Sequence, residues 1–133
     1  MDNNKCKTYF RITGDFDCQE IISLIDITPN KMFNKNDLRN NKEPYGFSSL
    51  SFCVCEDYNV YVYEQMENTI NLLQPKIEVL KYIKQKYKVD YCLEIVPILY
   101  VNQITPCLAP SKKVIKFCYE TDTEIDIDLY LIE

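Results

Sequence analysis

The 133-residue sequence contains no histidine and only two glycines, Gly14 and Gly46. Without an imidazole, a Ser-His-Asp or Cys-His nucleophile has no base, and zinc or iron sites lose their commonest ligand. Two glycines cannot form a P-loop or a dinucleotide-binding fingerprint, which both need several glycines at fixed spacing. We therefore expect no catalytic residues, no cofactor and no enzyme, and only carboxylate, Lys, Tyr or Cys chemistry stays open.

Long apolar runs are also missing. No stretch approaches the roughly 18 apolar residues of a membrane span, and the start, MDNNKCKTYF, lacks the apolar core of a secretory signal. We expect a cytosolic protein with no membrane contact. Seven cysteines are an odd number at irregular spacing, so reduced thiols are expected. The composition, 47% hydrophobic and 26% charged, predicts a single domain over residues 1–133.

The formal net charge of −5 is concentrated near the C-terminus. Residues 89–133 carry three Lys or Arg against eight Asp or Glu, whereas the two kinds balance in the rest of the chain. The one basic stretch is 76–88, with five lysines on a predicted helix. A solvated helix face explains these lysines, and we expect no nucleic-acid binding.

Hydrophobic periodicity predicts the order strand, helix, strand, two helices, strand, helix, strand. Strands are expected at 8–13, 47–55, 89–101 and 124–132, and helices at 17–26, 60–73, 76–87 and 112–119. Asp17, with Glu20 completing a capping box, and Ser111 are predicted helix N-caps, and Pro97 predicts a bulge or an edge. The fold class is α+β: an antiparallel sheet of about four strands with helices on one face, close to two ferredoxin-like strand-helix-strand halves.

Two segments near the N-terminus, YFRITGDFDCQEI and LIDITPNKMFNKND, resemble the bacterial domain-of-unknown-function family 4279. The closing segment EIDIDLYLI is similar to the last strand of that family, so the resemblance covers essentially the whole chain. Phe33 and Asn36 stand where the family usually has Trp and Gly, whereas Asp37 and Arg39 match. The resemblance implies the fold and a bacterial origin, and it carries over no catalytic residues.

The last predicted strand alternates most clearly. Its apolar face holds Ile125, Ile127, Leu129 and Leu131, and its polar face holds Glu124, Asp126, Asp128 and Tyr130. Three interpretations are open for the polar face: a solvated outer surface, a surface for a basic protein partner, or a site for a hard cation. The loop ligands that a calcium site needs are missing, and we expect no metal.

Two further groups of residues are candidates for a ligand-binding or metal-binding site. Phe33, Asp37, Arg39 and Tyr45 lie in or beside a long loop predicted at 30–44, where an arginine near aromatic rings suits an anion or a planar ligand. Alternatively, the aromatics pack on the sheet and Arg39 pairs with Asp37 or Glu43. Cys53 and Cys55 are expected to be buried core thiols, because no C-x-x-C motif supports a metal site.

The leading functional hypothesis is a non-catalytic module that binds a protein partner, of immunity or antitoxin-like type, with the partner basic. Acidity at one end and eleven tyrosines, a residue type common in interfaces, favour it. The alternative is a domain that senses or binds a small molecule and uses the 30–44 loop as a lid.

Overall fold

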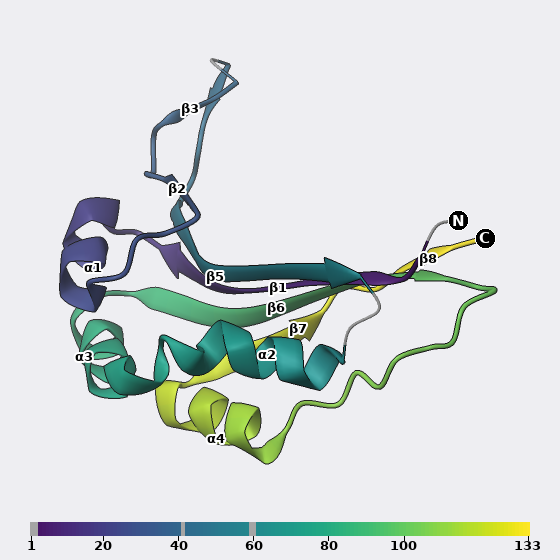
Figure 1. The fold of residues 1–133 in the computed structure, drawn as a ribbon. Helices are drawn as coiled ribbons and strands as arrows, with labels where there is room; N and C mark the ends of the chain where they lie inside the picture. The colour runs from purple at the N-terminus through teal and green to yellow at the C-terminus, as the bar shows by residue number, and fades with distance from the viewer. Residues whose placement is uncertain (1–2, 41, 59–60) are drawn as a thin grey trace.

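The computed structural model describes residues 3–40, 42–58 and 61–133 (Figure 1). The described residues form an α+β domain with four α-helices and eight strands. In chain order the elements are β1 (Lys5–Gly14), α1 (Cys18–Ile25), β2 (Lys31–Phe33), β3 (Leu38–Arg39), β4 (Glu43–Pro44), β5 (Ser48–Tyr58), α2 (Val62–Asn71), the 3₁₀ turn η1 (Gln74–Lys76), α3 (Ile77–Lys86), β6 (Val89–Tyr100), α4 (Lys112–Thr121), β7 (Thr123–Ile127) and β8 (Tyr130–Ile132). No helix among them is long and apolar enough to cross a bilayer.

The main sheet is mixed and has six strands in the order β2-β5-β1-β6-β7, with β8 also paired to β6. The prediction of an antiparallel sheet of about four strands is wrong for the last strand, because β7 and β8 run parallel to β6. The chain leaves the end of β6, returns through a coil and α4, and so enters β7 in the same direction. The ferredoxin-like division is also not observed, since β1 and β5 are antiparallel neighbours rather than the parallel strands of a crossover unit.

The core lies between the sheet and the helices α2, α3 and α4, which lie on one side of it (Figure 1). Alternate residues of β1 and β6 point toward the helices and are buried. Phe10 lies at the centre, with ring centroids 5.3 Å from Tyr91 and 6.0 Å from Phe117 on α4. No helix of the described residues lies against the other side of the sheet, here called the open face (Figure 1).

The predicted helix starts are confirmed at two residues. Asp17 accepts a hydrogen bond from Gln19 N (2.9 Å), and Ser111 Oγ accepts one from Val114 N (3.3 Å). Each bond satisfies a backbone N–H that has no partner within the helix. The predicted capping box is not formed, because Glu20 accepts a hydrogen bond from the Tyr87 hydroxyl at 3.0 Å.

Pro97 explains why the predicted last strand is divided into β7 and β8. Ile95 O accepts from Asp128 N, and Val101 N donates to Ile132 O, so odd-numbered residues of β6 direct their backbone groups toward β7 and β8. Pro97 is one of these residues and has no N–H to donate. The break at 128–129 lies opposite it, between the pairs Ile95–Ile127 and Ile98–Tyr130. Pro97 therefore lies inside a central strand and interrupts the ladder to its neighbour.

Candidate functional site: the C-terminal edge of the sheet

A reversal of the chain after α4 positions the last two strands. Asp122 caps α4 in the left-handed conformation (φ 53°), and its N–H bonds to the last turn of the helix. The Thr121 and Thr123 hydroxyls lie 2.6 Å apart and are buried at this corner. The chain then runs along β6 as β7, with Glu124 beside Cys92 and Asp126 beside Glu94.

The outer backbone edge of β7 and β8 faces away from the sheet, because in the described part of the chain both strands pair with β6 alone. Backbone groups alternate between the two sides of a strand. Asp128 N and Ile132 O bond to β6, so the N–H and C=O groups of Ile125, Ile127 and Leu131 point outward. This C-terminal edge, residues 123–132, is a template on which another strand can pair.

Side chains on both faces of the C-terminal edge are exposed. We expected Ile125, Ile127, Leu129 and Leu131 to form the apolar face of a half-buried strand, yet all four are exposed, Leu131 at 62%. The reason is that α4 contacts β7, whereas none of the four described α-helices extends as far as β8 (Figure 1). Tyr130 and Ile132 are exposed as well. The edge therefore combines an open backbone with exposed aliphatic and aromatic side chains.

The acidic residues predicted as a partner surface lie on the other face of the same edge. Glu124 and Asp126 lie on the open face, and the unchanged register across the break places Tyr130 in the same row. Asp128 lies at the break and accepts a hydrogen bond from the Tyr130 hydroxyl at 3.1 Å. The register and this hydrogen bond bring the four predicted residues together in one row, and all four are exposed.

The acids of β6 and β7 repel one another at this row. Burial, followed by the contact with Asp126, raises the pKa of Glu94, and Arg11 on β1 partly opposes the shift. Arg11, Glu94 and Asp126 line one shallow hollow of the open face. The acids of β6 and β7 therefore lie close enough to disfavour a further negative charge, which makes a positively charged occupant favourable.

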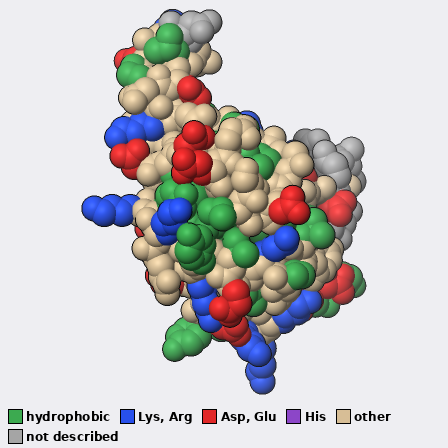
Figure 2. Space-filling model, turned by 90° about the vertical axis from the view of Figure 1, so that its left-hand side faces the viewer, with side chains coloured by type: hydrophobic (Ala, Val, Ile, Leu, Met, Phe, Trp, Pro, Cys, Tyr) green, Lys and Arg blue, Asp and Glu red, His purple; other side chains and the backbone are tan. Residues whose placement is uncertain are grey.

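The second predicted group lies on an arm, residues 31–40 and 42–47, which begins with β2 at the edge of the sheet and projects beyond it (Figures 1 and 2). Phe33 stacks on Tyr45 with ring centroids 3.6 Å apart, and Phe47 meets Phe33 edge-on. Asp37 accepts a hydrogen bond from Asn34 N (2.8 Å), and Arg39 lies on β3 opposite Glu43. The two aromatics thus meet, whereas Arg39 is in the separate hairpin β3–β4. The described residues of the predicted 30–44 loop contain three short strands, of which β2 joins the main sheet and β3 and β4 form a separate pair that projects from it (Figure 1).

The cysteines of the described chain are free thiols. Cys53 and Cys55, which we expected to be buried, are half-buried, and burial raises the pKa of Cys53 to about 11. Burial and the nearby Asp17 and Asp37 raise the pKa of Cys18 at the start of α1. Among the described residues no group of three or more Cys, Asp or Glu side chains is arranged to hold a metal ion.

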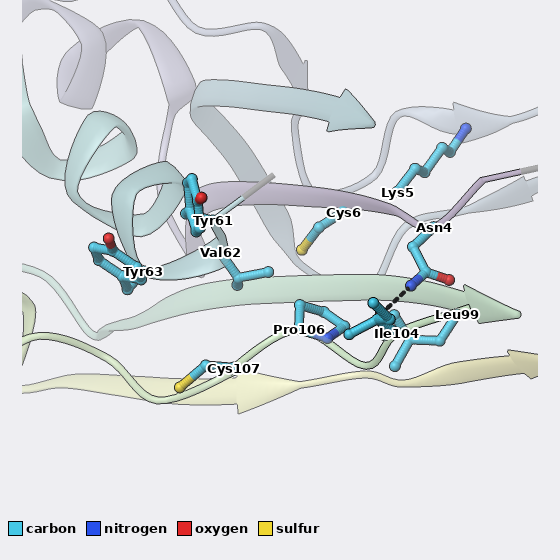
Figure 3. Close-up of a pocket in the computed structure, with 10 residues that line it drawn as sticks. All are labelled: Asn4, Lys5, Cys6, Tyr61, Val62, Tyr63, Leu99, Ile104, Pro106 and Cys107. Carbon is cyan, nitrogen blue, oxygen red and sulfur yellow. Dashed lines mark hydrogen bonds between the residues drawn. The ribbon is translucent and has the colours of Figure 1, made fainter. Parts of the chain in front are cut away.

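Sequence reasoning missed a hollow at the end of the sheet away from the arm, lined by Asn4, Tyr61, Ile104 and neighbouring residues (Figure 3). Asn4 reaches Ile104 across 100 residues of sequence, and no local pattern signals such a contact. The sequence carries one weak sign of this hollow: the coil after β6 contains apolar residues that follow neither helical nor strand periodicity.

The architecture defines a class: a small α+β domain with helices on one side of a mixed sheet and an open edge at its C-terminus. Within that class, the chain belongs to the family described as a domain of unknown function, DUF4279, whose profile matches residues 4–132. This confirms the family resemblance. No protein of curated function matches the chain, and no solved structure matches it.

Proposed function

We propose that this domain binds an extended, basic segment of a protein partner, which pairs with β7 and β8 as an added strand. The observation that carries the proposal is the C-terminal edge, whose outward backbone groups, exposed apolar side chains and carboxylates occur on the same ten residues. Main-chain hydrogen bonds supply affinity in this mode of recognition, and alternate side chains supply specificity.

The charge of the edge favours a basic partner over a second copy of the chain. A two-fold antiparallel pairing centred on Ile127 sets each Asp126 opposite an Asp128, and like charges directly opposite are destabilising. A strand with Lys or Arg at alternate positions instead meets Glu124 and Asp126 on the open face and places its apolar residues beside Ile125 and Ile127. An immunity or antitoxin-like role, in which the segment belongs to a basic toxin, is the biological form that this charge favours.

Two synthetic peptides test the proposal, one alternating Lys with Val and one alternating Glu with Val. We expect the Lys peptide alone to bind, more weakly at high salt, and to slow amide hydrogen exchange at Ile125, Ile127 and Leu131 in NMR spectra of the labelled protein. Protection that appears elsewhere, for example along β5, contradicts the proposal.

Three variants refine the test. Asp126→Asn with Asp128→Asn should weaken binding of the Lys peptide several-fold, whereas Glu78→Gln on α3 removes one exposed charge and should leave it unchanged. Ile127→Pro removes one outward N–H and no bond to β6, so it should abolish pairing while the melting curve stays close to that of the parent protein. Equal affinity in all variants places the partner at another surface.

A further inference from the structure

A hollow of about 620 Å³ lies between the start of α2, the start of β1 and the coil that follows β6 (Figure 3). Cys6, Val62 and Leu99 line it and are nearly fully buried. Tyr61 and Ile104 line it as well and are exposed, Ile104 at 93%. Its volume falls within the range of about 300–1,000 Å³ that small-molecule sites occupy.

The wall of this apolar hollow is held in place by Asn4. The Asn4 side chain is buried, accepts a hydrogen bond from Tyr100 N (2.8 Å) and donates one to Ile104 O (2.9 Å). These two bonds fix the coil to the end of β6. The hollow is therefore formed before a ligand arrives, which lowers the entropic cost of binding.

An acidic hollow of about 440 Å³ adjoins the apolar one, and Tyr61 lines both. Glu56, Asp57 and Glu64 line the acidic hollow. Lys5, at the apolar hollow, forms an ion pair with Glu56 at 2.9 Å. Lys7, the register partner of Glu56 on β1, also contributes positive charge at this carboxylate. The net negative charge of the acidic hollow therefore comes from Asp57 and Glu64.

A buried acceptor on α2 also lines the acidic hollow. Gln65 is only 3% exposed, and its Nε2 donates to Cys6 O at 2.7 Å and to Cys55 O at 3.0 Å. Its Oε1 accepts no hydrogen bond from any described residue. Buried polar atoms in native proteins nearly always have partners, so this oxygen calls for a donor such as N–H.

We propose that the two hollows together bind an amphipathic amine. Its apolar body occupies the hollow between Val62, Leu99 and Ile104, and its protonated amine enters the acidic hollow, where Glu64 and Gln65 Oε1 accept its N–H groups. The Tyr61 ring, at the boundary, suits the cation through its π face. The positive end of the α2 dipole opposes a cation by about half an elementary charge, which the Asp57 and Glu64 carboxylates outweigh. This site does not depend on the peptide-binding edge.

Three probes with one apolar body test the ligand class: 4-phenylbutylamine, 4-phenylbutan-1-ol and 4-phenylbutyrate, titrated calorimetrically into the purified protein. We expect saturable one-to-one binding of the amine, at least about tenfold tighter than the alcohol, and the weakest binding for the carboxylate. An alcohol that binds as tightly as the amine overturns the proposal, and so does the lack of saturable binding by any probe.

Variants separate the two hollows. Glu64→Gln should weaken the amine several-fold and leave the alcohol unchanged, whereas Ile104→Ser should weaken both, because it shortens the apolar wall. Asp57→Asn is the second acidic variant and Glu78→Gln the matched control, and melting curves establish that each variant is folded. The proposal is overturned if Glu64→Gln and Asp57→Asn both bind the amine as tightly as the parent protein does. Ile127→Pro should leave amine binding unchanged, so a failure of the edge proposal and a failure of this one are distinguishable.

Discussion

Glu94 on β6 and Asp126 on β7 are register partners, so their carboxyl groups share the open face across a parallel strand pair. Burial and this contact raise the pKa of Glu94, because each makes its ionised form less favourable. The acidic row is therefore maintained in the free protein at some cost to stability, and that cost depends on pH.

Glu94→Gln should stabilise the protein at pH 7. Because the pKa of Glu94 is higher in the folded state than its ordinary value of 4.5, the free energy of unfolding decreases as the pH rises through the folded pKa. We expect a gain of about 0.2–1 kcal/mol at pH 7, the range for cross-strand pairs, and none below pH 4.5, where the carboxyl is protonated in both states. Urea denaturation of both proteins at pH 7 and pH 4 measures the difference. An equal gain at both pH values contradicts the electrostatic explanation.

Gly14→Ala should destabilise the fold by about 1–3 kcal/mol, since a Cβ at Gly14 overlaps the carbonyl oxygen of Lys88 and the backbone must shift. Gly46→Ala is the matched control, because a Cβ there meets no atom within 4 Å. Melting temperatures of the two variants make the comparison. A Gly14→Ala protein as stable as Gly46→Ala would contradict the close approach of β1 to the backbone of Lys88 and Val89 at the start of β6.

Cysteine alkylation should proceed in well-separated phases. Cys107 is exposed, whereas burial raises the pKa of Cys6 and of Cys118 to about 11, so few of these thiols are ionised at pH 8. Iodoacetamide followed by mass spectrometry should label Cys107 first, and Cys107→Ser should remove the fast phase. Rapid labelling of Cys118 in the native protein is the result that this prediction forbids.

Tyr91→Phe should cost about 1 kcal/mol. The buried Tyr91 hydroxyl donates to Leu80 O at 2.7 Å and ties β6 to α3, so its loss leaves a buried carbonyl without this donor. Tyr119→Phe, at a residue 86% exposed on α4, controls for the loss of a phenol and should be neutral. Urea denaturation with unchanged m values tests both substitutions.

Local signals predicted the elements well. The caps Asp17 and Ser111 and the periodic residues of α2, α3 and α4 depend on neighbours within a turn or two. The direction of the last strand depends on its pairing with β6, which periodicity does not report. For the same reason the short strands of the arm, two or three residues each, were predicted as a loop.

For the candidate sites too, local features could be predicted from the sequence, and features that depend on the fold could not. Alternation correctly placed Glu124 and Asp126 on one face, because the register of a strand is local. The exposure of Ile127 and Leu131 depends on how far the helical layer extends over the sheet, which the sequence pattern does not contain. The Asn4 contact that shapes the apolar hollow joins residues at opposite ends of the chain, and it could be found only from the fold.

By dividing the outer strand into β7 and β8, Pro97 affects how readily this edge can pair with other copies of the chain. An exposed apolar edge is a hazard in a concentrated solution, because it can recruit strand after strand into a fibre. The proline divides this edge into segments of five and three residues, each shorter than the six or seven that a stable fibrillar core uses. Replacing Pro97 would lengthen the continuous ladder on the outer strand, so we expect this proline to oppose fibril formation while a short partner strand can still pair.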